Sequence, residues 1–322
     1  MITSSGDETR AASYDKVHPM KVSIVIRSKN EERFIGAVLA RVLEQEFDDP
    51  YEVLVLDSGS QDQTLDIVRG FPVRLAIMPP EQFTFGWALN QGASLTVGDI
   101  VVFLSAHCVP RERTWLRSLT APLMSDPQVA ATYGRQEPMP GVNPFEEIEL
   151  ERTFGPTADS AVLAHFSNAN SAIRRQLVTQ YPFDEVVNGG EDFLWAQSLP
   201  SSYTVRYVAT ASVFHSHPPS LCYWRRRAYI EGLLLPYLAQ RGIADPWALP
   251  TATQGPLSRF KWHVLKRLIA DARWLFRRRY FAALLYYPLY EANRIYSYTK
   301  GKRDGRLRYP PLNNVQPTTP NS

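Results

Sequence analysis

Chemically capable side chains stand at the end of one apolar run, "VVFLSAHCVP" (101–110). Ser105, His107 and Cys108 follow directly after residues that are typical of a buried strand. A serine hydroxyl and an imidazole can both hydrogen-bond a phosphate or a ribose, and an imidazole can also hold a metal ion. An apolar strand that runs straight into such groups indicates a strand that ends at a ligand site.

The elements around this run predict an α/β fold with a mostly parallel central sheet flanked by helices. Apolar, β-branched runs alternate with stretches of helical period, an order that gives parallel strands joined by right-handed crossovers. The expected strands are 22–26, 51–57, 73–78 and 100–105, and the expected helices are 30–45, 60–71 and 86–96. In the first helix Asn30 is the expected N-cap, with Glu31 and Glu32 in the first turn.

Ligands of such sheets bind beyond the carboxyl ends of the strands. The residues at those ends are polar here: they are 27–30 after the first strand, 57–60 at the end of the second and 105–108 after the fourth. We therefore expect these three segments to form one ligand site. This explains why the apolar run ends in a serine and a histidine.

The second half of the chain is less regular. A further strand is expected within 127–138, and a helix begins at Asn143 with Pro144 in its first position. Another helix is expected from about Glu191, and residues 203–217 alternate in the manner of an edge or mixed-sheet strand before two prolines. These elements would add a mixed portion to the parallel sheet.

Composition and cysteine content are those of an ordinary globular protein. Hydrophobic residues make up 44% of the 322 residues and charged residues 21%. The two cysteines, Cys108 and Cys222, lie in unlike surroundings, which favours reduced thiols in a cytosolic protein over a disulfide. No run of about 18 apolar residues predicts a membrane span, and the polar N-terminal segment looks like neither a signal peptide nor a membrane anchor.

Five motifs, in order, resemble those of the family 2 glycosyltransferases, which have the Rossmann-like GT-A nucleotide-diphospho-sugar fold. They are "VSIVIRSKNEE", "VLVLDSGSQDQT", "ALNQGASLTVGDIVVFLSAHCVP", "SNANSAIRR" and "NGGEDFLWA", and together they extend over roughly residues 20–220. Each motif alone is weak, but five in this order form a specific pattern. The resemblance implies a GT-A domain at 20–240 that takes a nucleotide-diphospho-sugar as its donor.

The resemblance also assigns residues to the donor. Asp57 matches the acid that accepts a hydrogen bond from a pyrimidine ring, which would select uracil or thymine, although a turn or N-cap role is the structural alternative. Asn30 and Glu31 match the segment that lies against the nucleotide. Arg27 stands where many members have proline, and it would put a cation near the diphosphate. The segment that approaches a donor or acceptor sugar is matched by Asn168 and Asn170.

Asp192 matches the general base of the family. Inverting sugar transfer needs a carboxylate within hydrogen-bond reach of the acceptor hydroxyl, opposite the leaving diphosphate. Glu191 would point elsewhere on the helix and is the candidate for an orienting or acceptor-binding group. The structural alternative is that both acids only open a helix, where negative charge suits the helix dipole.

The metal-binding motif departs from the family pattern. Most relatives have Asp-x-Asp where this chain has Ser105, Ala106 and His107, and that pair of acids holds Mg²⁺ or Mn²⁺ against the diphosphate. The pattern resembles the Asp-x-His variant of the polypeptide N-acetylgalactosaminyltransferases, which add a further histidine. His215 and His217 are the candidates for it, because residues two apart on a strand face the same side. Histidine favours Mn²⁺ or softer ions over Mg²⁺.

A site without a metal is the alternative. His107 would then donate a hydrogen bond to a phosphate or a ribose, with Ser105 and Ala106 against the donor. Arginines of "YWRRRAY" (223–229), Arg225 among them, would supply the positive charge on the diphosphate. These arginines could equally form a solvated helix face or a lipid-facing patch.

The last part of the chain is basic and aromatic. Residues 259–322 hold 14 Lys and Arg against 3 Asp and Glu, whereas residues 1–258 hold 21 against 29. Within 256–308 an apolar helical stripe is flanked by cations: the stripe is Val264, Leu265, Leu268, Ile269, Ala272 and Leu275 or Phe276, and the cations are Lys266, Arg267, Arg273 and Arg277. This predicts a basic amphipathic helix pair on an anionic membrane surface. Packing against the catalytic domain is the alternative, and the wide stripe and acidic body argue against nucleic acid.

Together these observations predict an inverting glycosyltransferase in the cytoplasm, bound peripherally to the inner face of the cytoplasmic membrane. Its donor would be UDP- or dTDP-linked, its acceptor a lipid-linked sugar or a polysaccharide, and the chain could form a homodimer. The segments 1–19 and 309–322 are expected to be disordered.

Two other functions are open to such a chain. A catalytically degenerate member would bind a nucleotide or scaffold a partner at the membrane, because Ser105 replaces a usual acid, but the intact Asp57 and Asp192 favour an enzyme. A nucleotidyltransferase would need a Gly-rich, basic loop after the first strand, which "RSKNEERF" lacks.

Overall fold

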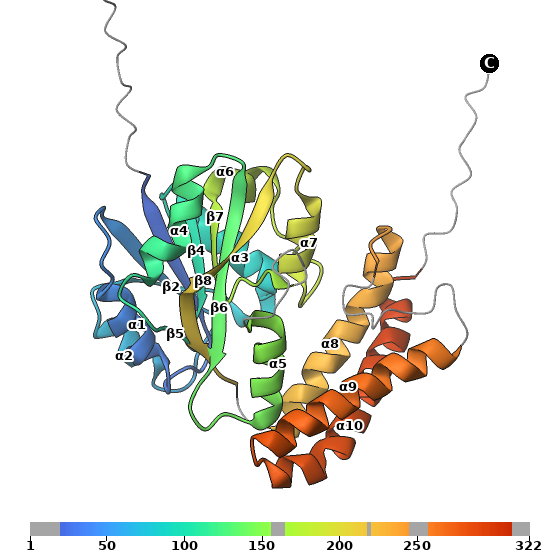
Figure 1. The fold of residues 1–322 in the computed structure, drawn as a ribbon. Coiled ribbons are helices and arrows are strands. Elements are labelled where there is room, and N and C mark those ends of the chain that lie inside the picture. The colour runs from blue at the N-terminus through green and yellow to red at the C-terminus, as the bar shows by residue number, and fades with distance from the viewer. Residues whose placement is uncertain (1–19, 156–164, 218–219, 245–256, 311–322) are drawn as a thin grey trace, which may run out of the picture.

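A computed structural model describes residues 20–155, 165–217, 220–244 and 257–310. Within these ranges the chain forms one eight-stranded sheet with helices packed on it, and a group of three long helices stands beside the sheet (Figure 1). Except for Tyr309 and Pro310, which are described at the end of α10, the segments 1–19 and 309–322, which we expected to be disordered, lie outside the described residues. So do the side chains of 257–264, Val264 of the predicted stripe included.

The parallel half of the sheet is the part that the sequence predicted. Its strands are β1 (Val22–Ser28), β2 (Tyr51–Asp57), β3 (Arg74–Ile77) and β4 (Ile100–Ser105), in the order β3-β2-β1-β4. All four expected strands are confirmed. The apolar runs of β1, β2 and β4 are buried because helices cover the sheet, whereas β3 is an edge strand and its Ile77 is 59% exposed. The register puts Ser28 beside Asp57 and Arg27 beside Ser105. The polar carboxyl ends of the strands therefore lie side by side.

The other half of the sheet is mixed. β7 (Asn170–Arg174) runs antiparallel to β4 and to β6 (Val129–Pro138), β6 is parallel to β8 (Thr204–His215), and β8 is antiparallel to β5 (Cys108–Pro110). The strands expected within 127–138 and 203–217 are confirmed, whereas β5 and β7 were not expected. In the β5–β8 pair Cys108 stands opposite His215. This pairing brings His107 to the carboxyl end of β8.

Short helices occupy the connections between strands. They are α1 (Ile35–Leu43), α2 (Thr64–Arg69), the 3₁₀ helix η1 (Pro80–Gln82), α3 (Phe85–Ser94), α4 (Trp115–Ser125), α5 (Pro144–Phe154), α6 (Arg175–Gln180) and α7 (Glu191–Ser198). The predicted start of α5 is confirmed, since the Asn143 side chain accepts a hydrogen bond from the Phe145 amide over 2.9 Å.

The predicted start of the first helix is wrong. α1 begins at Ile35, and Asn30 has a left-handed backbone with φ of 55°. Asparagine tolerates this conformation better than most residues. The side-chain oxygen of Asn30 accepts a hydrogen bond from the Gln61 amide (2.8 Å), and the Asn30 amide donates to the Ser60 hydroxyl (2.7 Å). Asn30 therefore joins the β1–α1 and β2–α2 loops instead of capping a helix.

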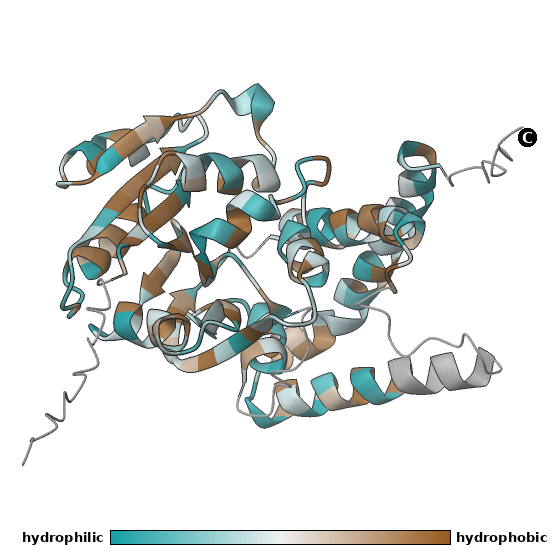
Figure 2. Ribbon diagram, turned by 90° about the horizontal axis from the view of Figure 1, so that it is seen from above, coloured by the Kyte–Doolittle hydropathy of each residue, from teal (hydrophilic) through white to brown (hydrophobic). Residues whose placement is uncertain are grey.

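Two apolar layers hold the sheet between helices. The first layer packs α1 and α4 on one face and includes Leu39, Trp115 and Leu119, all fully buried. The second packs α3, α6 and α7 on the other face through residues such as Leu89 and Trp195. Figure 2 shows the apolar residues concentrated in the strands at the centre of this body. Such a core fixes the strand ends on which the polar side chains stand.

Three long helices form the C-terminal part: α8 (Leu221–Gln240), α9 (Leu257–Arg277) and α10 (Phe281–Arg308). α8 and α10 approach closely because glycines stand at their contact. A methyl group on Gly232 would collide with the carbonyl of Tyr298, and one on Gly301 with the carbonyl of Tyr229. Among the described residues we find no helix with the length and hydrophobicity that a membrane span requires.

The predicted apolar stripe of α9 is divided between two environments. Leu275 is fully buried and Leu268 packs in the same cluster with α5 and α10. Ile269 and Phe276, in contrast, are 40% and 62% exposed. Arg267, expected to flank the stripe, is instead within ion-pair distance of three carboxylates. α9 therefore packs against the protein with one side and presents an apolar side to the surroundings.

Candidate active site

Three histidines come together at the edge of the sheet. His107 lies in the turn between β4 and β5, His215 ends β8, and His217 follows two residues later. The ring centre of His107 is 5.1 Å from those of both other histidines, which are 4.3 Å from each other. Potential ligand atoms, one from each residue, all lie within 4.8 Å of one another. The sequence left open which later histidine joins His107, and the structure brings both of them there.

Each of the three imidazoles is held at Nδ1 by an oxygen of another side chain. The pairs are His107 with Glu31 Oε1 (2.6 Å), His215 with Gln136 Oε1 (2.6 Å) and His217 with Glu146 Oε1 (2.7 Å). An imidazole that donates from Nδ1 keeps the lone pair of Nε2 for another partner. Nε2 of His215 is buried and has no hydrogen-bond partner among the residues that the structure describes. This donor set fits a metal ion held by three imidazole nitrogens.

Charge also favours a cation at this place. The side chain of Glu31 is 19% exposed, and Glu146 is only 2% exposed as a residue. Burial, reinforced by the neighbouring histidines, lowers the pKa of His215 well below its usual value. Burial likewise lowers the pKa of His217, although Glu146 acts in the opposite direction. These two imidazoles are therefore neutral at pH 7, and a divalent cation among the rings would balance the two carboxylates.

Ser105 and Ala106, which precede His107 in the segment that replaces the acidic motif, are bonded to neighbouring segments through their backbone amides. Ala106 is fully buried, and its amide donates to the carbonyl of Arg27 over 3.1 Å. The amide of Ser105 donates to the carbonyl of Ala169 over 3.1 Å, while its side chain is half-buried. The methyl group of Ala106 therefore belongs to the core and its amide is engaged, whereas contact of the Ser105 side chain with the donor stays a prediction.

The two acids at the start of α7 take different positions. Asp192 lines a cavity of about 640 Å³, and its Oδ1 accepts a hydrogen bond from the Phe193 amide (2.8 Å). Glu191 is 5% exposed and lies outside the described lining of that cavity. Burial raises the pKa of both acids, and the neighbouring Asp192 adds to the effect on Glu191, whereas the nearby Arg27 guanidinium opposes it at both. Only Asp192 faces the space that a ligand could occupy.

Arg27 is buried beside these acids with donors unused. Its Nη2 donates to the carbonyl of Asn168 (3.3 Å), and the guanidinium lies 5.4 Å from the ring centre of Phe85. Within the described part of the chain, Nε and Nη1 of Arg27 and Nδ2 of Asn168 have no hydrogen-bond partner. A buried polar group without a partner costs about 1–3 kcal/mol. Arg27 and Asn168 are therefore suited to a polar ligand, and their contact with the donor stays a prediction.

Asp57 has the turn role that the sequence held as an alternative. It is fully buried, its Oδ1 accepts from the amides of Gly59 (2.9 Å) and Ser60 (2.7 Å), and its Oδ2 accepts from the Ser60 hydroxyl (2.6 Å). These bonds fix the β2–α2 loop. A carboxylate has about four acceptor positions, so one remains on Oδ2. Recognition of a pyrimidine by Asp57 stays a prediction.

The cavity joins the two groups of predicted residues. His215, His217 and Asp192 all line it, together with residues of α5, of α8 and of the segments 165–167 and 188–190. Its volume lies within the range of small-molecule sites. His215 and His217 of the triad and the acid of α7 therefore open onto a space large enough for a substrate.

The arginines of α8 that reach this cavity are not the predicted one. Arg226 and Arg227 line it, whereas Arg225 lies outside the lining, although all three arginines are exposed. The reason is the helical period. Residues three or four apart share a face of the helix, so Arg226 and Arg227 lie on the same side as Tyr223 and Ile230, whereas Arg225 points away. Any positive charge that α8 supplies to the cavity comes from Arg226 and Arg227.

Sequence reasoning missed two residues of the site, Gln136 and Glu146. No motif marks them, because Gln136 lies within β6 and an acid in the first turn of a helix, such as Glu146, has an ordinary explanation in the helix dipole. Asn170, in contrast, is structural. Its side chain accepts from Trp115 Nε1 (3.0 Å) and donates to the carbonyl of Ala211 (2.9 Å) within the core.

Comparison with known proteins agrees with the motifs. Residues 23–181 match the family model described as glycosyl transferase family 2. The O-antigen chain rhamnosyltransferase WbaN of Salmonella anatum is 29% identical over 181 residues, 52% of this chain and 57% of WbaN. The O-antigen chain rhamnosyltransferase RfbN of Salmonella typhimurium is 27% identical over 214 residues, 62% of this chain and 67% of RfbN. The chain thus spans between about half and two thirds of the length of these two relatives.

Solved structures share the fold. The mannosyltransferase PcManGT of Pyrobaculum calidifontis, in complex with GDP-Man and Mn²⁺, superposes with a TM-score of 0.56 at 19% identity, over 91% of this chain and 87% of PcManGT. Glucosyl-3-phosphoglycerate synthase of Mycobacterium tuberculosis, in complex with Mn²⁺, UDP and glucosyl-3-phosphoglycerate, has a TM-score of 0.51 at 21% identity, over 70% and 81% of the two chains. At these identities the likeness concerns the fold alone.

Proposed function

The chain is a member of glycosyltransferase family 2 with the GT-A fold, and on this premise we propose that it transfers a sugar from a nucleotide-diphospho-sugar to a hydroxyl group of a glycan or lipid-linked acceptor. The observation that carries the proposal is the common cavity. Asp192 and the histidines 215 and 217 line it at the carboxyl ends of the strands, where ligands of such sheets bind.

Asp192 is the proposed general base of an inverting transfer. The acceptor oxygen attacks the anomeric carbon, the bond from that carbon to the diphosphate oxygen breaks, and the hydroxyl proton passes to a carboxylate oxygen of Asp192. The products are the glycoside of opposite anomeric configuration and the nucleoside diphosphate. The bond from the Phe193 amide occupies Oδ1 of Asp192. Because that bond fixes the carboxylate, Oδ2 is the oxygen we assign to the proton.

The histidine triad is the proposed metal site, with Nε2 of His107, His215 and His217 as ligands. A divalent cation held there would neutralise charge on the leaving diphosphate. Three imidazoles favour Mn²⁺ or softer ions over Mg²⁺. The Mn²⁺ named with the structures of PcManGT and glucosyl-3-phosphoglycerate synthase supports this choice. Glu31 is then a group that orients His107, a role different from the nucleotide contact that the resemblance implied.

The donor is proposed to be UDP- or dTDP-linked. Asp57 would accept from the pyrimidine ring through its remaining position, and Asn30 would lie against the nucleotide. Arg27 and Asn168 would use their unpartnered donors on the diphosphate or the sugar. The two rhamnosyltransferase relatives support a deoxyhexose as the transferred sugar.

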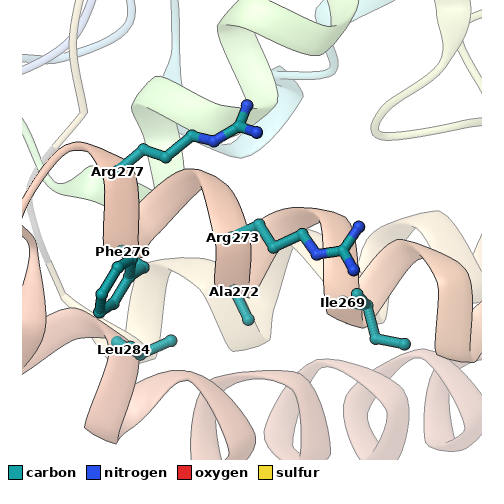
Figure 3. A pocket seen from close by; sticks show the side chains of 6 residues that line it. All are labelled: Ile269, Ala272, Arg273, Phe276, Arg277 and Leu284. Carbon is teal, nitrogen blue, oxygen red and sulfur yellow. The ribbon is translucent and has the colours of Figure 1, made fainter.

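We propose further that the C-terminal helices hold the enzyme on an anionic membrane surface, on the inner face of the cytoplasmic membrane. A pocket of about 330 Å³ lies at the contact of α9 with α10. Figure 3 shows that the guanidinium groups of Arg273 and Arg277, which line it, extend away from Phe276 and Leu284. Apolar side chains beside cations are the composition that binds anionic interfaces. A lipid-linked acceptor would be found at such a surface.

Calorimetric titration with UDP- and dTDP-sugars, with and without Mn²⁺, tests donor binding, and mass spectrometry detects transfer. Asp192→Asn should bind the donor like the wild type and lose about 10²- to 10⁴-fold in turnover, the contribution of a general base. Asp66→Asn, at an exposed acid of α2, is the control and should transfer normally. Unchanged turnover in Asp192→Asn would show that Asp192 is not the general base. If the wild type binds no nucleotide-sugar, the transferase proposal is wrong, and a protein that scaffolds a partner becomes the better explanation.

A further inference from the structure

Helix α5 carries acids on two opposite faces. Glu146, Glu149, Leu150 and Thr153 follow the helical period and line the cavity. Glu147 and Glu151 point away from the cavity, toward α9 and the turn after it. One short helix therefore contacts the active site with one face and the C-terminal helices with the other.

Glu146 holds His217 more firmly than an ordinary side-chain contact would. Its carboxylate accepts two bonds from this residue, one from the backbone amide (3.0 Å to Oε1) and one from Nδ1 (2.7 Å to Oε1). Among the described residues no Lys or Arg forms an ion pair with this buried acid. Two bonds to one residue fix both the position of the chain after β8 and the orientation of the ring. The negative charge of Glu146 is left for a cation on the far side of the imidazole.

The opposite face of α5 is attached to the C-terminal helices by charged hydrogen bonds. Glu147 accepts from Arg278 (2.6 Å) and from the Tyr280 hydroxyl (2.9 Å). Glu151 accepts from Trp274 Nε1 (3.0 Å) and from Arg278 (3.3 Å). Arg278 thus bonds to acids one helical turn apart, which fixes α5 against rotation about its axis.

Apolar packing seals the same contact. Phe145 and Ile148 of α5 form one buried cluster with Leu275 of α9 and with Tyr287 and Tyr290 of α10. The rings of Phe145 and Tyr290 stack with their centres 4.2 Å apart. Phe145 directly precedes Glu146, so a displacement of the cluster would move the acid that holds His217.

We propose that Glu146 is the positioning residue that aims His217 at a divalent metal ion, and that α9 and α10 set its position by holding α5. The C-terminal helices are then part of the metal site although none of their residues is a ligand. The proposal rests on the metal site of the proposed function. It gives these helices a role inside the enzyme that is separate from contact with a membrane.

A purely structural role of Glu146 is the competing explanation. In that case the acid only anchors the backbone amide of His217, and its loss would lower the stability of the fold without changing the geometry of bound metal. The two explanations therefore predict different affinities and ligand geometries for a metal ion bound to the Glu146 variant.

Cobalt(II) is the probe, because its visible absorption reports ligand geometry and its binding can be measured on the full chain without any sugar. The wild type should bind one Co²⁺. Glu146→Gln, which keeps the size of the side chain, should weaken Co²⁺ binding about 10- to 100-fold and shift the absorption band, as losses of such outer groups do. Asp66→Asn, at an exposed acid of α2 that contacts neither the cavity nor the C-terminal helices, is the control and should keep the wild-type spectrum.

The contribution of the C-terminal helices is tested at adjacent arginines. Arg278→Ala removes the bonds to Glu147 and Glu151 and should weaken Co²⁺ binding about two- to fivefold, the range of partly exposed ion pairs. Arg277→Ala is the control, and we expect wild-type binding because no ion pair of Arg277 occurs within the described residues. Thermal unfolding without metal shows whether each variant is folded.

Three results would overturn the proposal. If Glu146→Gln keeps the wild-type affinity and spectrum, Glu146 does not position the metal ligand. If Arg278→Ala and Arg277→Ala bind Co²⁺ alike, the C-terminal helices do not set the site. If the wild type binds neither Co²⁺ nor Mn²⁺, the metal site itself is wrong, whereas sugar transfer is still judged by donor binding and Asp192→Asn.

Discussion

Two neighbouring residues of α9 allow the two roles of the C-terminal helices to be separated. Leu275 is fully buried in the cluster with α5 and α10, whereas Phe276 is 62% exposed. We predict that Leu275→Ala lowers the stability of the fold and leaves vesicle binding unchanged. Phe276→Ala should do the reverse, since its side chain contributes little to the packed core.

The expected magnitudes follow from burial. Removing a fully buried leucine side chain costs about 2–5 kcal/mol through lost transfer energy and the cavity left behind. For Phe276, 62% of a side chain of about 200 Å² leaves about 120 Å² that a membrane could cover, worth about 3 kcal/mol at most. Partial insertion at an interface reduces this gain, so we expect a loss of vesicle affinity of about tenfold. Phe276→Ala itself should change stability by about 0.5 kcal/mol or less.

The assay is sedimentation of the full chain with vesicles of phosphatidylglycerol and phosphatidylcholine, beside urea unfolding of the same variants. Binding should depend on the anionic lipid and weaken with salt, because Arg273 and Arg277 flank the exposed face. Val97→Ala is the control for an exposed apolar side chain elsewhere, since Val97 is 75% exposed on the sheet body.

The reasoning fails if Phe276→Ala binds anionic vesicles like the wild type, or if Leu275→Ala loses binding while it remains folded. Equal losses of stability in both variants would contradict the division of the α9 stripe into a buried and an exposed side. Binding to vesicles of phosphatidylcholine alone, with no effect of salt, would remove the role of the arginines.

Two further predictions concern the fold. Burial, with the help of Asp192, raises the pKa of Glu191 above that of the unfolded chain, so its contribution to the free energy of unfolding falls as pH rises above about 4.3. Glu191→Gln should therefore raise the melting temperature at pH 8 and change it little at pH 4, and an equal effect at both would contradict the burial of a charged acid. Gly301→Ala should destabilise the α8–α10 contact because the methyl group meets the Tyr229 carbonyl. Gly36→Ala is the control, because α1 has space for a methyl group there, and it should be neutral or stabilise the fold by up to about 1 kcal/mol. Similar losses of unfolding free energy in Gly301→Ala and Gly36→Ala would contradict the close contact of α8 with α10.

Local patterns were sufficient for the parallel half of the sheet. The apolar runs at β1, β2 and β4 are continuous because both faces of those strands are covered, and such runs are visible in one dimension. The start of α5 was equally visible, since Asn143 and Pro144 suit the first positions of a helix. The helix-cap prediction for Asn30 was wrong because asparagine is common both at helix N-caps and at loop positions with a left-handed backbone.

The site was only partly predictable. Residue type and family resemblance singled out His107, His215 and His217 as candidate metal ligands and Asp192 as the candidate base. Which of Arg225, Arg226 and Arg227 face the cavity depends on the phase of α8, which the sequence of three arginines does not fix. Glu146 could not be found, because its distance from His217 along the chain gives no sign of the contact.

The sequence by itself determined which side chains are chemically capable and which strand ends carry them, because strand and helix periods and the types of side chain are local properties. The tertiary structure alone decided which of these side chains meet. The antiparallel pairing of β5 with β8 brings His107 to His215, and the packing of α5 between the cavity and α9 brings Glu146 to His217. Such contacts join segments about 70 to 110 residues apart, and they arise from the burial of apolar surface over the whole fold, which no short stretch of sequence contains.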